Sequence, residues 1–471
     1  MIDLKSLTIK EARKKLDEKI FSAVELAQAY LAEIKKKNKE LNAYLEVFDD
    51  VLAQAKMADE RIAQGESSPL LGIPLAIKDN ILIKGKIASS ASKILENYTA
   101  SYDATVIAKL KKQGAVFLGR TNMDEFAMGG STENSAYGVT RNPHDLSRVA
   151  GGSSGGSVVA VVADLALGAL GSDTGGSVRE PASFCGIVGM KPTYGRVSRY
   201  GLIAMGSSLD CIGPIAKNTE DAQIIYDAIY GPDILDSTMI TNTTYPKISS
   251  KKVIGVPWDL VKDKGVDPKV QENFAESIKK LESLGFKIKD ISLKNLEIAL
   301  AVYYIIMPAE ASTNLARFDG VRYGLHKDGK NLLEDYMRTR GAGFGKEVRR
   351  RILLGAYVLS HGYYDAYYGK AQMVQNDLKK EFAKAFESID LIATPTAPFV
   401  AWKIGEKSDP LSVYLADIFT VTANIVGVPA ISVPSGFLET EGKKLPLGIQ
   451  FMATHGAEDA LFEVGKRFEG I

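Results

Sequence analysis

Apolar residues recur with helical spacing in the first part of the chain and give way to short apolar runs further on. Capping-box patterns begin at Thr8 and at Ser22, and each opens a segment whose apolar residues fall on one helical face. The run 43–48 predicts a strand, and a helix follows it to about Gln64. The short apolar run 71–80 predicts a second strand that ends in charged residues.

The same alternation continues to the end of the sequence. Further helices are predicted at 103–113, 158–162, 268–284, 296–317 and 346–386. Further strands are predicted at 115–118, 165–170, 252–256, 286–291, 391–394, 430–433 and 447–452. Helices and strands that alternate at this spacing are typical of an α/β fold, in which helices cover a sheet.

The chain shows no internal repeat and no linker longer than a loop. We therefore predict one large α/β domain over residues 1–471 rather than two independent domains. Its parts are N-terminal helices at 1–65, a core at 66–235, and a C-terminal part of the same sheet at 236–471. A helical insertion is expected near 295–390.

The charge balance of the chain argues against a nucleic-acid-binding protein. The 471 residues include 58 basic and 57 acidic side chains, which gives a formal net charge of +1 and a pI near 7.6. A protein that holds nucleic acid by neutralising phosphates usually has a strongly basic domain or stripe. We therefore do not expect this chain to bind nucleic acid by itself.

Cysteine content and hydropathy predict a cytoplasmic protein. The two cysteines, Cys185 and Cys211, form no C-x-x-C pattern, and the N-terminal residues have no apolar leader. The longest nearly apolar stretch, 158–170, is interrupted by Asp164 and is too short to span a bilayer. We expect no membrane partner, and the sequence contains no metal-ligand cluster such as H-E-x-x-H.

Glycine is concentrated in the middle of the chain. Seventeen of the 43 glycines fall between Gly129 and Gly213. Such a block is either flexible filler or a place where the backbone approaches other atoms closely. The segment is not of low complexity, because a helix and a strand are predicted inside it.

Two familiar glycine-rich motifs fit this block poorly. A phosphate-binding loop of the Walker type needs a lysine, and none occurs from 150 to 190. Gly151-Gly-Ser-Ser-Gly155 matches the G-x-S-x-G nucleophile elbow, but turn-forming and charged residues precede it where a strand is required. None of the four histidines lies in a recognisable catalytic motif.

Ser177 is a better candidate nucleophile. It follows the predicted strand 165–170 and a Thr174-Gly-Gly turn, and it opens a predicted helix. The backbone N–H groups of Thr174, Gly175, Gly176 and Ser177 would then be free to form an oxyanion hole, with no side chain on the two glycines to block approach. A serine needs a base, and Lys78, at the end of an apolar strand, is the candidate.

Lys78, Ser153 and Ser177 with their flanking residues resemble the amidase signature family, and 151–193 matches that signature without a gap. The resemblance implies a central mixed, twisted sheet covered by helices on both faces. It also implies that Ser177 attacks an amide carbon while Ser153, preceded by a cis peptide, relays the proton to Lys78. To act as base at neutral pH, Lys78 must have a pKa lowered by about 2–3 units, which the apolar strand explains by desolvation.

Three further residues are expected to support the catalytic residues Lys78, Ser153 and Ser177. We expect Ser154 to form hydrogen bonds within the site rather than to react itself. Asp173 and Arg179 lie on either side of the nucleophile, and we expect them to pair and hold its loop.

Resemblance outside the signature points to one subfamily. The segments 122–134, 310–320, 346–355 and 362–368 are similar to the A subunits of glutamyl-tRNA(Gln) amidotransferases. That likeness implies a glutaminase in a heterotrimer with B and C subunits, to which it passes ammonia. It also implies that ATP, Mg²⁺ and most of the tRNA contact belong to the partner, and that this chain carries no cofactor.

Glutamine as substrate requires a cation for its carboxylate and an anion for its ammonium. Arg351 offers a planar fork suited to a carboxylate, although Arg349 and Arg350 leave the register open by one residue. Asp417 is the candidate for the ammonium, and Tyr303 is a further candidate by its position in the family pattern. The alternatives are a solvated arginine face, an exposed loop acid and a core tyrosine.

Two other functions remain open for this sequence. A stand-alone amidase for small or apolar amides would share Lys78, Ser153 and Ser177 but would need an apolar channel for its substrate. A scaffold without activity would keep the fold and lose the chemistry, although all three candidate positions are intact.

Overall fold

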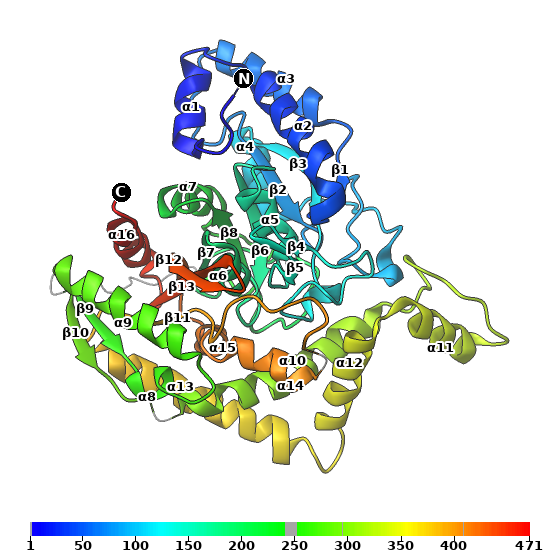
Figure 1. The fold of residues 1–471 in the computed structure, drawn as a ribbon. Coiled ribbons are helices and arrows are strands. Elements are labelled where there is room, and N and C mark those ends of the chain that lie inside the picture. Colours follow the sequence, from blue (N-terminus) through cyan, green and yellow to red (C-terminus); the bar gives the residue numbers. More distant parts are fainter. Residues whose placement is uncertain (1, 241–251, 294, 408) are drawn as a thin grey trace.

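An eleven-stranded mixed sheet runs through the middle of the molecule, with helices on both of its sides (Figure 1). The computed structural model describes residues 2–240, 252–293, 295–407 and 409–471. The strands lie in the order β1 (Tyr44–Val47), β3 (Val116–Thr121), β2 (Pro74–Lys78), β6 (Gly168–Asp173), β8 (Cys211–Ala216), β7 (Val188–Lys191), β12 (Ala430–Thr440), β13 (Lys443–Ala453), β11 (Leu391–Pro395), β9 (Val253–Val256) and β10 (Lys287–Asp290). The predicted α/β class with a mixed sheet is confirmed.

The central strands are buried along their whole length. Every residue of β2, β3, β6 and β8 is buried, which is why these strands read as apolar runs rather than as alternating patterns. β2 and β6 are parallel neighbours, with Ile77 opposite Leu170. The carboxyl ends of both strands therefore reach the same edge of the sheet, where ligands usually bind in α/β folds.

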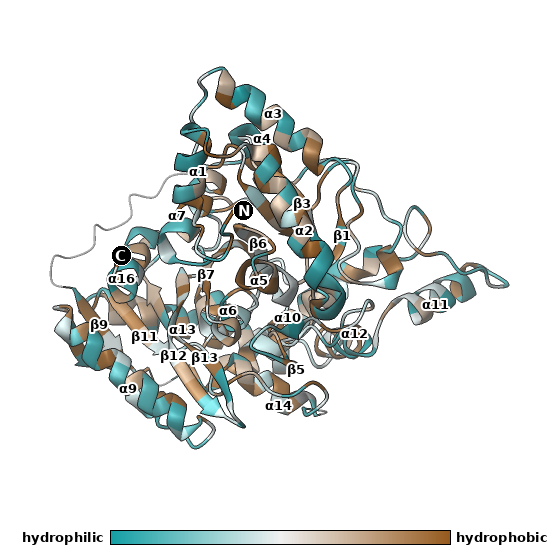
Figure 2. Cartoon of the chain, turned by 45° about the horizontal axis from the view of Figure 1, so that its top comes forward, coloured by the Kyte–Doolittle hydropathy of each residue, from teal (hydrophilic) through white to brown (hydrophobic). Residues whose placement is uncertain are grey.

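Two short helices connect this edge to the second half of the sheet. α5 (Gly155–Val162) packs against β2 and β6, and it also contacts α6 (Arg179–Cys185). α6 in turn packs against β7, β12 and β13. Figure 2 shows apolar residues concentrated in the central strands and α5, whereas α2 and α9 present polar residues on their outer faces.

The remaining helices surround this core or continue the chain beyond it. They are α1 (Ile9–Asp17), α2 (Ala23–Leu41), α3 (Val51–Ala63), α4 (Thr105–Gln113), α7 (Thr219–Ile229), α8 (Trp258–Val261), α9 (Pro268–Ser283), α10 (Ala299–Asn314), α11 (Leu332–Gly343), α12 (Lys346–Val358), α13 (Lys370–Phe386), α14 (Pro410–Tyr414), α15 (Val421–Val426) and α16 (Glu458–Glu469). The capping boxes predicted at Thr8 and Ser22 are both present at the starts of α1 and α2.

The helical insertion is formed by α10 to α13, and α11 extends away from the rest of the molecule (Figure 1). The single long helical region expected at 346–386 is wrong in one respect. α12 ends at Val358, and a short π-helix, Asp365–Gly369, precedes α13. Gly362 lies between them with a φ of +86°, a left-handed conformation that a continuous helix does not contain.

The helical stretch Leu296–Arg317 is long and apolar enough to cross a membrane by composition alone. Half of its most apolar window is buried inside the fold, however. Its main part, α10, packs against α12, α13 and α15. This stretch is therefore accounted for as a core helix, whose apolar character serves packing within the protein.

The last two strands are longer than their apolar runs predicted. β12 and β13 form one hairpin of eleven residues on each strand, with a register shift at Pro434–Gly436. Glu441 and Gly442 connect them with φ angles of +52° and +71°. Two successive positive φ values are typical of the tight hairpin turn, and they let pairing continue through the polar ends of both strands.

Candidate active site

Lys78 stands at the carboxyl end of β2, beside the end of β6. Its Nζ lies 2.9 Å from the hydroxyl of Ser172 and 3.2 Å from the carbonyl oxygen of the same residue. The lysine side chain has no exposed surface. The parallel register of β2 and β6 thus brings a buried amine to the edge of the sheet and surrounds it with hydroxyl and carbonyl groups.

The two serines before α5 complete the surroundings of this amine. Nζ of Lys78 lies 2.8 Å from Oγ of Ser153 and 2.8 Å from Oγ of Ser154. The peptide bond Gly152–Ser153 is cis. The N–H of Ser154 donates to the carbonyl oxygen of Ser177 at 3.1 Å, so the two serine-bearing loops lie against one another. The structure brings Lys78, Ser153 and Ser154 into direct contact and places Ser177 next to them.

The amine of Lys78 is easily neutralised. Burial lowers its pKa from 10.5 to about 7, against the opposing charges of Asp124, Asp173 and Asp210. The cause is desolvation, which penalises the charged form of a buried amine. A substantial fraction of Lys78 is therefore neutral at pH 7 and able to accept a proton through Ser153.

The loop that carries Ser177 is held by the side chain of Asp173. One carboxylate oxygen accepts the N–H of Gly176 at 2.9 Å, and the other accepts that of Val178 at 3.1 Å. Arg179 pairs with both oxygens of Asp173 at 2.9 and 3.0 Å. Burial disfavours the charge on Asp173, but Arg179 outweighs it and lowers the pKa to about 2. The expected pair is therefore present as a bidentate, charged anchor.

This anchor corrects one part of the expected oxyanion hole. The N–H of Gly176 is already donated to Asp173, because a carboxylate three residues earlier reaches it directly. Within the described part of the chain, the N–H groups of Thr174, Gly175 and Ser177 have no acceptor. The helix also begins later than expected, since α6 starts at Arg179. Ser177 itself is 8% exposed, and its hydroxyl makes no hydrogen bond to a described residue.

The two glycines before Ser177 make room for the protein's own side chains. A β-carbon on Gly175 would lie 2.7 Å from the ring of Tyr303, and one on Gly176 would lie 2.3 Å from the hydroxyl of Thr420. The expectation that these glycines leave open space for a substrate is therefore wrong. They let Tyr303 of α10 and Thr420 pack directly onto the nucleophile loop.

Burial distinguishes the three arginines on α12. Arg349 and Arg350 are exposed, whereas Arg351 is buried. The guanidinium of Arg351 pairs with Glu347 at 2.7 Å and lies 5.5 and 5.4 Å from the ring centres of Tyr304 and Tyr414. Burial disfavours its charge, but these tyrosines and Glu347 raise its pKa further. A planar cation is thus held in a fixed orientation by one acid and by two tyrosine rings that stack on each other beside it.

Asp417 belongs to the same cluster. Its carboxylate accepts the hydroxyl of Tyr304 at 3.0 Å, and that tyrosine stacks on Tyr414 with ring centres 3.9 Å apart. Desolvation raises the pKa of Asp417 to about 7. Asp417 is partly buried rather than an exposed loop acid, and it shares tyrosine neighbours with Arg351. The candidate carboxylate and ammonium ligands thus lie on one cluster.

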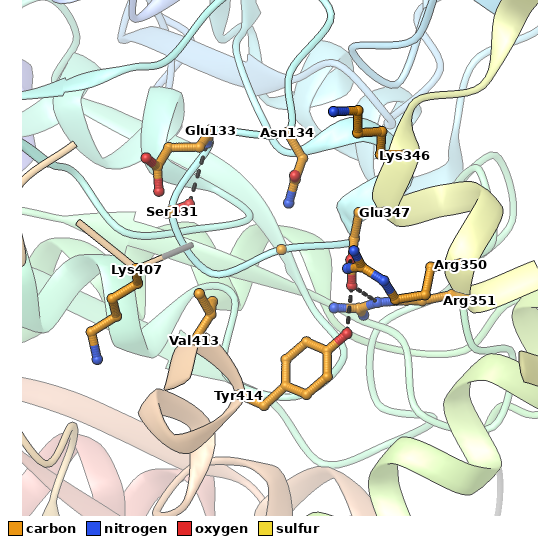
Figure 3. Close-up of a pocket in the computed structure, with 11 residues that line it drawn as sticks. Ser131, Glu133, Asn134, Lys346, Glu347, Arg350, Arg351, Lys407, Val413 and Tyr414 are labelled. Atoms are coloured by element: carbon orange, nitrogen blue, oxygen red, sulfur yellow. Dashed lines mark hydrogen bonds and ion pairs between the residues drawn. The ribbon is translucent and has the colours of Figure 1, made fainter. Parts of the chain in front are cut away.

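A cavity of about 230 Å³ opens beside this cluster. Figure 3 shows Tyr414 and Arg351 both directed at Glu347 on one side of it, with the 131–134 loop opposite. A β-carbon on Gly152 would lie 2.6 Å from the backbone nitrogen of Ser131, so the loop that lines the cavity touches the residue before Ser153. The lining residues are Gly129, Ser131, Glu133, Asn134, Lys346, Glu347, Arg350, Arg351, Lys407, Val413 and Tyr414.

Comparison with known proteins places this geometry in one family. The family described as Amidase matches residues 25–462. The chain belongs to the amidase family. The A subunit of glutamyl-tRNA(Gln) amidotransferase from Desulfatibacillum aliphaticivorans is 50% identical over 475 aligned residues, which cover 99% of this chain and 97% of that protein.

Solved amidase structures share the whole fold. The crystal structure of the A subunit of glutamyl-tRNA(Gln) amidotransferase from Thermotoga maritima is 42% identical, has a TM-score of 0.81, and covers 100% of this amidase and 95% of its own chain. A peptide amidase in complex with the competitive inhibitor chymostatin has a TM-score of 0.83 at 28% identity, with coverage of 100% and 98%. Because both fold scores are similar, the shape of an amidase does not select its substrate.

Three polar residues of this amidase site were not predicted. Ser172 contacts Lys78, and Asn80 donates to the hydroxyl of Ser172 at 2.9 Å. Asp124 accepts the N–H of Thr132 at 2.8 Å and so shapes the loop that lines the cavity. Ser172 lies within the glycine-rich signature, and Asp124 lies within a segment that resembles the A subunits. The pairing of β2 with β6 is the signal that would have placed Ser172.

Proposed function

We propose that this amidase is the glutaminase subunit of a tRNA-dependent amidotransferase. It releases ammonia from the side chain of glutamine and passes it to a partner subunit that amidates Glu-tRNA(Gln). The observation that carries the hydrolysis is the 2.8 Å contact between the buried amine of Lys78 and Oγ of Ser153. The identity of about half of all residues, over nearly the full length, with chains named as this subunit supports glutamine as the amide.

The reaction begins with a proton relay. Neutral Lys78 takes the proton of Ser153, Ser153 takes that of Ser177, and Oγ of Ser177 bonds to the carboxamide carbon. The relay then returns one proton to the leaving nitrogen, so the C–N bond breaks and ammonia departs. Water attacks the remaining glutamyl ester in the same way, and glutamate leaves while Ser177 regains its proton. The unpaired N–H groups of Thr174, Gly175 and Ser177 support a role in stabilising the oxyanion.

Recognition of free glutamine falls to the insertion and to the segment after α14. Arg351 takes the α-carboxylate, and the stacked pair of tyrosines beside its guanidinium, together with Glu347, fixes the direction of its donors. Asp417 takes the α-ammonium. Tyr303 packs on Gly175 and forms the wall between this pair and the nucleophile loop.

The partners supply the rest of the reaction. We assign tRNA, ATP and Mg²⁺ mainly to the B and C subunits of a heterotrimer, because the net charge of this chain is only +1. We place the protein in the cytoplasm, where thiols stay reduced; Cys185 and Cys211 are both free and buried.

The decisive experiment measures glutamate release from glutamine. The chain is assayed alone and together with B and C subunits and glutamyl-tRNA, and Ser177→Ala is compared with Ser277→Ala. Ser277 is a buried serine of α9 whose hydroxyl bonds only within its own helix, to the carbonyl of Asn273. We expect Ser177→Ala to abolish release and Ser277→Ala to leave it intact.

Two results would contradict the proposal. Unchanged release by Ser177→Ala would remove the nucleophile from the mechanism. A wild-type complex that hydrolyses apolar or peptide amides and ignores glutamine would instead identify a stand-alone amidase, the function that the likeness to the peptide amidase represents.

A further inference from the structure

Glu180 is a fully buried acid in the first turn of α6, and the mechanism does not use it. Its Oε2 accepts the N–H of Gly152 at 3.0 Å, and Gly152 immediately precedes Ser153. Oε1 has no hydrogen-bond partner among the described protein atoms. The carboxyl therefore makes a single hydrogen bond, to the backbone that carries the bridging serine.

The surroundings of this carboxyl are tightly packed. A β-carbon on Gly151 would lie 2.6 Å from Oε2, and one on Gly130 would lie 3.7 Å from Oε1. Gly151 has a φ of +82°, so both its conformation and the space it leaves favour glycine. The absence of a side chain at Gly151 allows Glu180 to reach Gly152 from α6, whereas a β-carbon on Gly130 would only contact the carboxyl.

Charges around Glu180 oppose its ionisation. Asp417 faces it from the segment after α14, and Asp124 from the loop after β3, whereas the thiol of Cys185 on its own helix is neutral because burial raises its pKa. The nearby cation is Lys407, whose Nζ lies over the rings of Phe399 and Trp402 and donates to the carbonyl oxygen of Ser412; the described side chains of Lys407 and Glu180 form no ion pair. Arg179, the preceding residue, is committed to Asp173.

An ionised carboxylate in this position would be costly. One of its oxygens would be buried with no donor among the described protein atoms, and Lys407 would act on the charge only from a distance, without an ion pair. Protonation removes the charge and leaves the bond from Gly152 intact, because a carboxylic acid still has an oxygen that accepts. Burial raises the pKa of Glu180 well above its usual value, and the charge of Asp417 adds to this effect.

We propose that Glu180 is an uncharged acid at neutral pH and positions Ser153 by holding Gly152. It is a positioning residue, since it touches neither substrate nor reacting atoms. This inference rests on the role that the proposed function gives to Ser153. It implies that a carboxamide, which has the same shape and no charge, can replace Glu180, whereas removal of the carboxyl releases Gly152.

The kinetic test compares three variants in the assembled complex. We expect Glu180→Gln to keep most of the wild-type kcat for glutamine hydrolysis, and Glu180→Ala to lower kcat by about tenfold or more with little change in KM. Glu469→Gln is the control, because Glu469 is a partly buried acid that also accepts a backbone N–H, that of Thr219, far from the site. Equal losses in Glu180→Gln and Glu180→Ala, or full activity of Glu180→Ala, would overturn the proposal.

A second test is independent of activity. The unfolding of the full chain is measured from pH 5 to pH 7 for wild type and Glu180→Gln. An unfolded glutamate ionises near pH 4.5. If the folded one stays protonated, the folded state binds more protons, and wild type loses stability as pH rises.

The ratio of the unfolding constants, wild type over Glu180→Gln, should then grow about tenfold per pH unit. A ratio that stays constant over this range would show an ionised Glu180 and refute the inference, whatever the variants do in the assay. A complex that fails to hydrolyse glutamine while the ratio grows would refute the proposed function and leave the inference about Glu180 standing.

Discussion

The pH dependence of hydrolysis tests the buried amine of Lys78 most directly. Only the neutral amine can accept the proton from Ser153, so the rate must rise with pH until Lys78 has lost its proton. Burial places that midpoint at a pKa of about 7. We expect kcat for glutamine hydrolysis to increase about tenfold per pH unit below this value and to level off above it.

The magnitude of the effect follows from the same pKa. At pH 7.5 an amine with a pKa of about 7 is roughly three-quarters neutral, whereas one with the usual pKa near 10.5 is neutral in about one molecule in a thousand. The desolvation of Lys78 thus increases the amount of usable base roughly 700-fold, equivalent to about 4 kcal/mol.

Two variants separate this effect from other titrations. Lys78→Arg keeps the charge and cannot release it near neutral pH, so it should lose activity at every pH tested. Asp210→Asn removes a carboxylate that raises the pKa of Lys78, so the acidic limb should move to lower pH. The assay is glutamate release by the complex from pH 5.5 to 9. A flat profile from pH 6 to 8, or an active Lys78→Arg, would refute the reasoning.

Three further predictions concern recognition and packing. The KM for glutamine should fall as pH rises through about 7, because Asp417 ionises there; Asp417→Asn should raise KM about tenfold or more and remove this dependence. Arg351→Lys should raise KM by at least about tenfold because an ammonium cannot replace the planar fork, whereas Arg349→Lys, at an exposed position outside the cavity lining, should change it little; equal effects would contradict the assignment of Arg351. Gly175→Ala should lower kcat/KM by about 10–100-fold by displacing the ring of Tyr303, and Tyr303→Ala in the same chain should restore folding stability, measured by thermal unfolding.

The residues that the sequence predicted best are those whose chemistry depends on local sequence. The apolar strands and the Gly-Gly turn predicted Lys78 as a base and Ser177 as a nucleophile, whereas the bridging role of Ser153 came from the resemblance to the amidase signature family. Asp173 and Arg179 were expected to pair because they lie on either side of one short loop. In each case the partner groups sit on the same turn or follow a predicted strand.

The features of the site that could not be predicted from the sequence depend on contacts between distant segments of the chain. Nothing local shows that Tyr303 and Thr420 fill the space above Gly175 and Gly176, since they come from α10 and from the chain before α15. We expected four oxyanion donors, but the N–H of Gly176 donates to the side chain of Asp173. That bond depends on the shape of the loop, which residue spacing alone does not determine. Likewise, burial rather than pattern distinguishes Arg351 from its two neighbours on α12.

Arg179 has a consequence for how the enzyme is made. Besides Asp173, its guanidinium contacts the carbonyl oxygen of Thr420 and the side chains of Asn424 and Gln450, which lie 241 to 271 residues further along the chain. A nascent chain therefore carries Lys78, Ser153 and Ser177 long before the groups that fix the nucleophile loop have been synthesised. Translation must pass Gln450 before the loop is held from both ends of the sequence, so prematurely terminated products contain the reactive residues without their support.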